Sequence, residues 1–211
     1  EYIKAVSREC DFPEEALLLE KAGSFQHPDI ERIISIKPDF VISGGGVQKK
    51  AIRKLERLNI PVIVFYPDRL EKTAGNIILL GEIFGVQGRA KKIAAPFFEI
   101  MKRPDKGNGV TAYIGLWGGP LMSVSGKSLT GEMLRKAGAV NIFERAKSDY
   151  PKVSPEEIVK ASPEVIILLY DPEKDYLENP AIRNTPAAKN NSCLLYTSPS
   201  PRDRTRSRMP S

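Results

Sequence analysis

The sequence predicts an α/β fold of two Rossmann-like lobes, bridged by a long helix, with a ligand cleft between the lobes. Three observations lead to this fold class. Short apolar runs alternate with segments of helical periodicity, as in parallel sheets whose strands are buried on both faces. A twelve-residue pattern occurs twice, 125 positions apart, at Glu31 and at Glu156. A helical segment at 87–103 lies between the two copies and is the expected connector.

In the first lobe, a strand–helix–strand unit is expected. Phe40–Ile42 and Val62–Phe65 are the two apolar runs, and apolar residues recur at helical spacing over 47–58 between them. A connection of this length between buried strands is a right-handed crossover, so the two strands are predicted to be parallel. A further helix is predicted over 68–84, ending at Gly85.

The second lobe is expected to begin after the connector helix at 87–103, which contains Pro96 and should bend there. Its predicted elements are a strand at 110–114, helices over 128–137 and 154–161, and a strand at 165–169. The predicted domains are an N-terminal lobe (1–85), a bridging helix (86–106), a C-terminal lobe (107–191) and a tail (192–211).

The repeated pattern runs from Glu31 to Ile42 and again from Glu156 to Ile167. Each copy starts a helix with a carboxylate, meets a proline seven residues later and continues into an apolar strand. A repeat of this size indicates two similar lobes. Two α/β lobes on a connector leave a cleft, where small ligands commonly bind.

The segment 192–211 differs from the rest of the chain. Its Ser-Pro and Arg-Ser content has no apolar periodicity, so it is expected to be disordered and without a part in the core. It resembles translated cloning sequence, and the fold prediction leaves it out.

The formal net charge of +6 does not by itself indicate a nucleic-acid partner. Four arginines and one aspartate in 192–211 supply +3 of it, and the other +3 is spread over helices of mixed sign. No run of 18 apolar residues is present, so no segment is expected to span a membrane, and no secretory signal opens the chain.

A metal centre is not expected from the ligand inventory. The chain has two cysteines, Cys10 and Cys193, and one histidine, His27. A structural zinc site needs about four Cys or His ligands and a catalytic one about three. His27 precedes Pro28 at the expected start of a helix, and no partner that would make it a catalytic base is identified.

Two glycine-containing motifs fail the rules for phosphate loops. After Gly44-Gly45-Gly46 a dinucleotide fingerprint needs another glycine, but that position is Lys49. Before Gly126-Lys127-Ser128 a Walker A loop needs a glycine where Leu121 stands. The first motif is interpreted as a tight strand-to-helix turn, and Ser128 as a helix N-cap. No catalytic residue is assigned.

Aromatic residues in loops are the candidates for ligand contact. Trp117 lies in a glycine-rich loop past a strand, and Phe25 and Tyr150 also lie in loops. A large aromatic at such a place either meets a ligand or covers the edge of a core, and the residues alone leave both readings open.

Ordered motifs in both lobes resemble the cobalamin and ferric-siderophore binding proteins of ABC importers, and the second-lobe motifs are most similar to the cobalamin-binding branch. They are Cys10–Ala16, Gly23–Phe25, Pro28–Ile33, Lys37–Ile42, Leu58–Val62 and Asn76–Gly81 in the first lobe, and Pro120–Ser123, Ser125–Lys127, Ala137–Phe143 and Tyr150–Glu156 in the second.

The resemblance implies a ligand site and a docking site. Its ligand-binding positions are Phe25, Gly44, Gly45, Trp117, Tyr150 and Glu9. Glu9 stands where some cobalamin binders have an aromatic, which suits a more polar or cationic ligand. Glu31 and Glu156 match the acids that meet permease arginines, one in each lobe. The resemblance further implies that the first strand and helix of the first lobe and the last elements of the second lobe are missing.

The expected protein is therefore a non-catalytic, monomeric, extracytoplasmic or periplasmic substrate-binding protein. It would deliver a metal chelate, a cobalamin-like corrinoid, to the permease subunits of an ABC importer, with no cofactor and no nucleic-acid partner. Its mode of membrane anchoring, including a lipid anchor, stays open. The alternatives are a ferric-siderophore or haem binding protein of the same family and a doubly wound α/β enzyme.

Overall fold

The computed structural model describes residues 2–105, 109–170 and 180–195, without the side chains of residues 180 and 181. Contacts along the chain divide it into two compact units, Glu1–Pro67 and Asp68–Ser211. The division falls earlier than the predicted lobe boundary at 85, because the helix that begins at residue 70 packs against later helices. The predicted lobe limits, the bridging helix and the cleft stay predictions.

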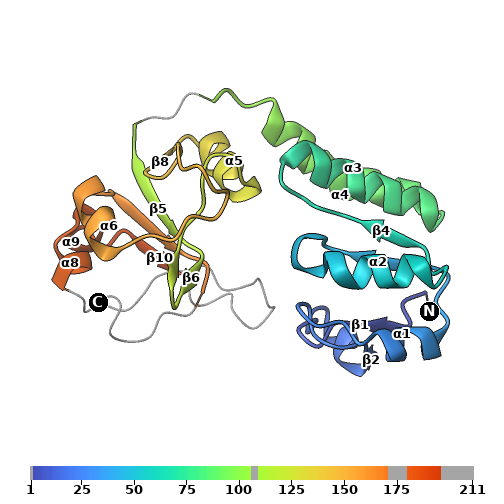
Figure 1. The fold of residues 1–211 in the computed structure, drawn as a ribbon. Coiled ribbons are helices and arrows are strands. Elements are labelled where there is room, and N and C mark those ends of the chain that lie inside the picture. Colours follow the sequence, from blue (N-terminus) through green and yellow to red (C-terminus); the bar gives the residue numbers. More distant parts are fainter. Residues whose placement is uncertain (1, 106–108, 171–179, 196–211) are drawn as a thin grey trace. The chain divides into compact units, whose positions relative to one another are not determined.

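The first unit holds two pairs of parallel strands and two α-helices, drawn in blue and cyan in Figure 1. Its elements are β1 (Ala5–Val6), β2 (Glu20–Lys21), α1 (Ile30–Ile36), β3 (Val41–Ser43), α2 (Lys49–Arg57) and β4 (Val62–Val64), with short 3-10 turns at Glu14–Leu18 and Gly46–Gln48. β1 pairs with β2, and β3 pairs with β4 across α2. The predicted parallel crossover is therefore confirmed.

The second unit begins with two helices, α3 (Leu70–Ile83) and α4 (Gln87–Met101). They lie side by side as a helical hairpin, green in Figure 1, and the turn between them contains Gly85 with a φ of +67°. That backbone conformation strongly favours glycine. α4 continues through Pro96.

A four-stranded parallel sheet forms the centre of the second unit, in the order β10-β9-β5-β8. The strands of this unit are β5 (Thr111–Gly115), β6 (Trp117–Gly118), β7 (Leu121–Met122), β8 (Val140–Asn141), β9 (Val165–Leu168) and β10 (Cys193–Leu195). Its further helices among the described residues are α5 (Leu129–Lys136), α6 (Pro155–Ala161), α8 (Pro180–Arg183) and α9 (Pro186–Lys189). β6 and β7 form an antiparallel hairpin beside the sheet.

Alternate residues of the central strand β5 enter two separate cores. Tyr113 is fully buried in a cluster with Ile158 of α6 and Ile166 of β9. Its neighbours Ala112 and Ile114 are buried in a second cluster with Leu134 of α5. This is the two-residue period of a strand buried on both faces.

The repeated sequence pattern folds in the same way in both units. Asp29 caps α1 by accepting a hydrogen bond from the Arg32 N–H, and Ser154 caps α6 by accepting one from the Glu157 N–H. These caps stand 125 positions apart, like the rest of the pattern. The predicted carboxylate-led helix starts are confirmed.

The ends of the two helices also correspond. Lys37 and Ser162 follow α1 and α6 with left-handed φ values of 51° and 49°, and each precedes a proline. Ile33 and Ile158, again 125 positions apart, are the buried residues of their helices. The same cap, core and exit positions therefore recur in the two units.

The C-terminal prediction was wrong at its start. The segment from position 192, which was expected to be a disordered tail, includes strand β10. This strand pairs with β9 and adds an edge strand to the sheet. Its three residues, Cys-Leu-Leu, are apolar enough to add to a sheet edge, a signal that the serine and arginine content around them obscured. Burial raises the pKa of the Cys193 thiol, consistent with this position in the sheet. The rest of the predicted tail, 196–211, lies outside the described residues.

The helical hairpin is held to α5 by two charged side chains one helical turn apart. The Glu132 carboxylate is buried and accepts a 2.9 Å hydrogen bond from the Leu70 N–H, at the start of α3. The Lys136 ammonium donates to the carbonyls of Met101 (3.0 Å) and Arg103 (2.8 Å), at the end of α4. An acid at a helix N-terminus and a base at a helix C-terminus both complement the helix dipole.

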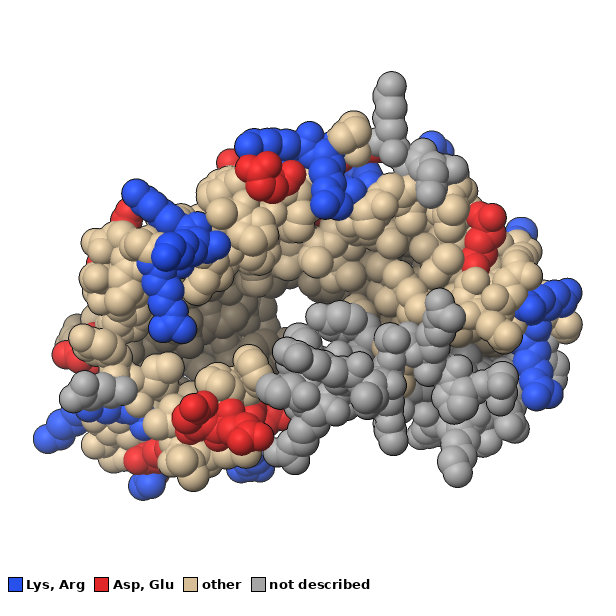
Figure 2. Space-filling view, turned by 180° about the vertical axis from the view of Figure 1, so that it is seen from behind, with Lys and Arg blue, Asp and Glu red and all other residues tan. Residues whose placement is uncertain are grey.

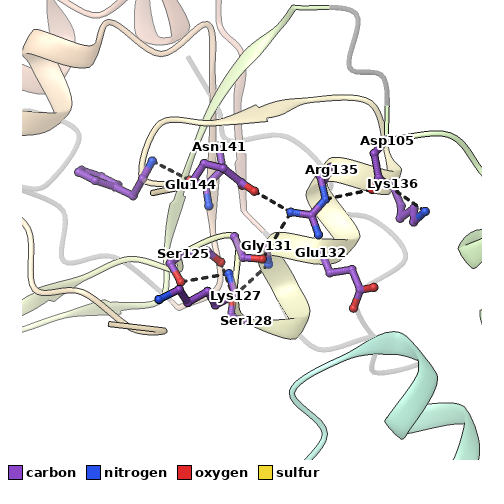
Figure 3. Close-up of polar contacts among 12 residues, drawn as sticks. Asp105, Ser125, Lys127, Ser128, Gly131, Glu132, Arg135, Lys136, Asn141 and Glu144 are labelled. Carbon is purple, nitrogen blue, oxygen red and sulfur yellow. Dashed lines mark hydrogen bonds and ion pairs between the residues drawn. The ribbon is translucent and has the colours of Figure 1, made fainter. Parts of the chain in front are cut away.

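A neighbouring cluster of polar contacts holds α5 itself in place, as Figure 3 shows. Arg135 donates a 2.6 Å hydrogen bond to Glu144 and lies near the Asp105 carboxylate. Asp105 also pairs with Lys136 at 2.8 Å, and this hydrogen bond lowers the pKa of the Asp105 carboxyl. Partly exposed pairs of this kind contribute little singly, but the pair with Asp105 holds the Lys136 ammonium that caps α4.

Basic and acidic side chains are both present across the face shown in Figure 2. This face therefore carries charge of both signs, as the sequence predicted. Among the described residues, no helix combines the length and the hydropathy that a membrane span requires.

Replacing Glu132 with Ala should lower the free energy of unfolding by about 1–3 kcal/mol, because the buried Leu70 N–H loses its acceptor. Urea unfolding monitored by circular dichroism measures this change. Glu71→Ala is the control, since Glu71 is an exposed acid in the first turn of the same helix and should change stability by less than about 0.5 kcal/mol. Equal effects of the two substitutions would contradict the capping role of Glu132.

Candidate ligand-binding surfaces

The loop after strand β3 has the tight turn that the sequence predicted. Gly45 adopts φ 71° and ψ −145°, a conformation that is essentially restricted to glycine. A Cβ atom on Gly44 would lie 3.3 Å from the ring of Phe25, so this ring lies against the loop backbone. The structure therefore brings three predicted ligand-binding residues, Phe25, Gly44 and Gly45, into one place.

Gln48 connects the members of this loop by hydrogen bonds. Its Oε1 accepts from the Ser43 hydroxyl (2.5 Å) and from the Gly44 N–H (3.1 Å), and its Nε2 donates to the Phe25 carbonyl (2.8 Å). The side chain is buried, which makes these bonds costly to lose. Sequence reasoning missed Gln48. Its signal was a glutamine at the start of a helix directly behind a glycine loop.

Glu9 lies in the same assembly but makes a contact that the sequence did not indicate. Its carboxylate accepts a 2.9 Å hydrogen bond from the backbone N–H of Phe25. The side chain is exposed. Glu9 therefore orients the segment that carries Phe25, and its predicted ligand contact stays a prediction.

Exposed apolar side chains surround the glycine loop. Phe25 and Tyr66 each keep 46% of their surface exposed, and Val64 keeps 47%. Val64 and Tyr66 are the residues closest to a Cβ built on Gly45, at 3.0 and 4.0 Å. Val64 ends the parallel strand β4 and Tyr66 follows it, at the carboxyl end where ligands of α/β folds commonly bind, so their position was a usable signal. This group of Phe25, Gly44, Gly45, Val64 and Tyr66 is named the first aromatic surface.

In the second unit, Trp117 lies on the β6–β7 hairpin. Its indole keeps 57% of its surface exposed, and its Nε1–H donates a 3.0 Å hydrogen bond to the Gly119 carbonyl. Next to it, a Cβ on Gly118 would lie 2.8 Å from the ring of Tyr170. The hairpin therefore rests on the Tyr170 ring, and the indole is displayed outward.

Tyr150 precedes a segment that pairs with the same hairpin. The Ser123 N–H donates to the Pro151 carbonyl at 2.9 Å, and the backbone of Met122 forms an antiparallel β-bridge with that of Lys152. Met122 is also the cross-strand partner of Trp117. Trp117 and Tyr150, which is 39% exposed, thus belong to one loop assembly, the second aromatic surface.

The two candidate docking acids occupy matching places on α1 and α6. Glu31 and Glu156 both lie in the first helical turn and are exposed. Within the part of the chain that the structure describes, no ion pair involves either carboxylate. Their charges are therefore available to an external partner.

The rejected phosphate-loop reading of Gly126-Lys127-Ser128 is replaced by a helix start, visible in Figure 3. The Ser128 hydroxyl oxygen accepts from the Gly131 N–H at 3.1 Å, which confirms it as the N-cap of α5.

The single histidine, His27, is exposed, and its backbone N–H donates to the Ser24 hydroxyl oxygen in a tight turn. No group of three or more potential metal ligands is found among the described residues.

Replacing Gln48 with Ala should destabilise the first unit by about 1–3 kcal/mol, since it removes three hydrogen bonds from a buried position. Urea unfolding is the measurement, and Gln87→Ala on an exposed helix start is the matched control. Gln48 would be assigned no part in holding the loop if its loss cost no more than that of Gln87.

Comparison with known proteins places these surfaces in context. A family model described as a periplasmic binding protein matches residues 3–199. The vitamin B12-binding protein of Vibrio campbellii is 34% identical over 167 residues, which are 77% of this chain and 61% of that protein. The vitamin B12-binding protein of Vibrio parahaemolyticus is 31% identical over 167 residues, which are again 77% of this chain and 61% of that protein. The chain thus spans about three fifths of the length of these relatives.

Solved structures of similar fold bind more than one kind of ligand. The periplasmic vitamin B12-binding protein of Vibrio cholerae has a TM-score of 0.74 at 24% identity, covering 92% of this chain and 78% of that one. A periplasmic haem-binding protein of Pseudomonas aeruginosa has a TM-score of 0.72 at 21% identity, covering 91% and 75%. At these identities the likeness establishes the fold.

The resemblance read from the sequence motifs is confirmed by the family match, which covers most of the chain. The doubly wound enzyme that the sequence left as an alternative is displaced by this match, because the family consists of non-enzymatic binding proteins. The chain belongs to the periplasmic binding protein family.

Proposed function

We propose that this chain is part of an extracytoplasmic substrate-binding protein that captures a cobalamin-like corrinoid and delivers it to an ABC importer. The observation that carries the proposal is the 34% identity to a vitamin B12-binding protein over 77% of the chain. The family membership supports binding without chemical turnover.

The two aromatic surfaces are the proposed ligand contacts. Phe25 and Trp117 are each about half exposed and are attached to rigid backbone by hydrogen bonds. A large, partly apolar chelate gains affinity from aromatic faces and from backbone that no side chain shields. At the glycine pair 44–45 the side chains of Phe25, Val64 and Tyr66 cover the backbone, so these side chains are the contacts offered there, and Tyr66 adds an aromatic with a polar hydroxyl.

A haem or ferric-siderophore ligand is the second candidate. The fold of this chain is shared with the haem-binding protein of Pseudomonas aeruginosa at a TM-score of 0.72. Glu9, beside Phe25, would favour a ligand with polar or cationic groups. Titration of the chain with cyanocobalamin, haemin and a set of ferric siderophores separates these ligands, and the proposal expects the tightest binding for the corrinoid.

Trp117→Ala should weaken corrinoid binding by about 1–3 kcal/mol, as loss of an aromatic anchor typically does. Isothermal titration calorimetry measures the affinity without relying on Trp117, which is the sole tryptophan. In the unsubstituted chain, corrinoid binding should also quench its fluorescence. Phe98→Ala, which removes a half-exposed aromatic on α4, is the control and should leave affinity unchanged. An unaltered affinity in Trp117→Ala would remove the second aromatic surface from the proposed site.

We also propose that Glu31 and Glu156 contact arginines of the two permease subunits. Charge pairs at the rim of an interface mainly steer and orient the encounter. The double variant Glu31→Ala with Glu156→Ala should bind ligand and unfold as before, while its association with the reconstituted importer slows at least tenfold. Surface plasmon resonance at two salt concentrations measures this rate.

The matched control for docking is Glu71→Ala with Glu82→Ala. These are exposed acids of α3, and their removal changes the net charge by the same amount. If the control slowed association as much as the Glu31 and Glu156 variant, general charge rather than specific docking would explain the result.

A further inference from the structure

Helix α2 carries all five of its basic side chains on one face. Lys49, Lys50, Arg53, Lys54 and Arg57 are exposed, and with 3.6 residues per turn they fall within an arc of about 140°. The sequence interpretation of mixed-sign helices does not hold for this helix, whose single acid is Glu56.

The opposite face of α2 attaches the helix to its unit. Leu55 is 2% exposed, and Ala51 and Ile52 are half-buried. The helix packs against α1 and β4. Its basic face is therefore directed away from the core of the first unit.

Most of this charge arrangement does not serve the stability of the helix, and only Lys54 and Arg57, in the last turn, complement the helix dipole. Lys49 with Arg53, Lys50 with Lys54, and Arg53 with Arg57 are like charges four residues apart, which destabilise a helix. Lys49 and Lys50 also stand in the first turn, where the helix dipole disfavours cations. Among the described residues, no ion pair compensates any of the five.

We propose that this basic face binds the anionic lipid headgroups of the membrane that holds the importer. A row of cations on the outside of a helix, without a pocket, suits a flat surface that offers many anions. The location rests on the proposed function, because α2 packs beside α1, and α1 carries the proposed docking residue Glu31. Contact with the headgroups would keep the protein near the membrane and raise its encounter rate with the permease.

The test is co-sedimentation of the full chain with vesicles, without any ligand for the aromatic surfaces. Phosphatidylcholine vesicles should bind no protein, whereas vesicles with one part phosphatidylglycerol to two parts phosphatidylcholine should bind it. Binding should disappear near 1 M salt, where the Debye length is about 3 Å. Lys50→Gln with Lys54→Gln should lower the partition coefficient about 25-fold, or about fivefold for each charge removed.

The matched control is Lys91→Gln with Lys92→Gln, two exposed lysines of α4 that change the net charge equally. Its partition coefficient should stay within twofold of that of the unsubstituted chain. Equal losses in both double variants, or no preference for phosphatidylglycerol, would overturn the proposal. Thermal unfolding of the α2 variant should be unchanged or improved, since like-charge repulsion is relieved, so a folding defect would not explain a loss of binding.

Two further outcomes separate this inference from its rivals. If the α2 variant bound vesicles normally but associated more weakly with the importer in detergent, the face would bind protein and the lipid proposal would be wrong. Because the assay contains no ligand, failure of corrinoid or haem binding would sink the proposed function without changing the vesicle result.

Discussion

The second unit depends on the capping of a helical hairpin by one short helix. α3 begins and α4 ends close to α5, where their peptide dipoles present partial charges of opposite sign. Glu132 and Lys136 are four residues apart on α5. The Glu132 carboxylate meets the positive end of α3, and the Lys136 ammonium meets the negative end of α4. The buried carboxylate satisfies a backbone N–H that has no partner within its own helix.

The candidate ligand contacts are also held in place by hydrogen bonds between segments that are distant in the sequence. In the first unit, one buried glutamine satisfies a hydroxyl, an amide N–H and a carbonyl from two segments distant in sequence. In the second, the β6–β7 hairpin is paired with the segment after Tyr150. Aromatic rings supported in this way lose little side-chain entropy on binding a ligand, which favours affinity. Exposed aromatic surface and rigid attachment together distinguish these residues from an ordinary solvent-facing loop.

Charge on this protein is organised by helix. α1 and α6 each start with an exposed acid, and α2, packed beside α1, carries five basic residues on one face. Charges of both signs on the neighbouring helices α1 and α2 suit the proposed approach to a membrane and the proposed docking to a permease. The acidic contacts would act mainly on association rates, because exposed ion pairs contribute little to equilibrium affinity. Each basic side chain near an anionic surface would instead add about 1 kcal/mol to equilibrium binding.

The sequence alone determined the alternation of strands and helices, the duplicated helix-to-strand pattern and the N-cap at Ser128, because each depends on local periodicity, proline placement or capping chemistry. Only the tertiary structure revealed the roles of Gln48 and Glu132, since their partners lie up to 62 residues away. It likewise decided that β10 joins the sheet, because a three-residue apolar run becomes a strand only where an edge is open to it. Local rules fix elements, whereas hydrogen bonds between distant segments fix which side chains meet.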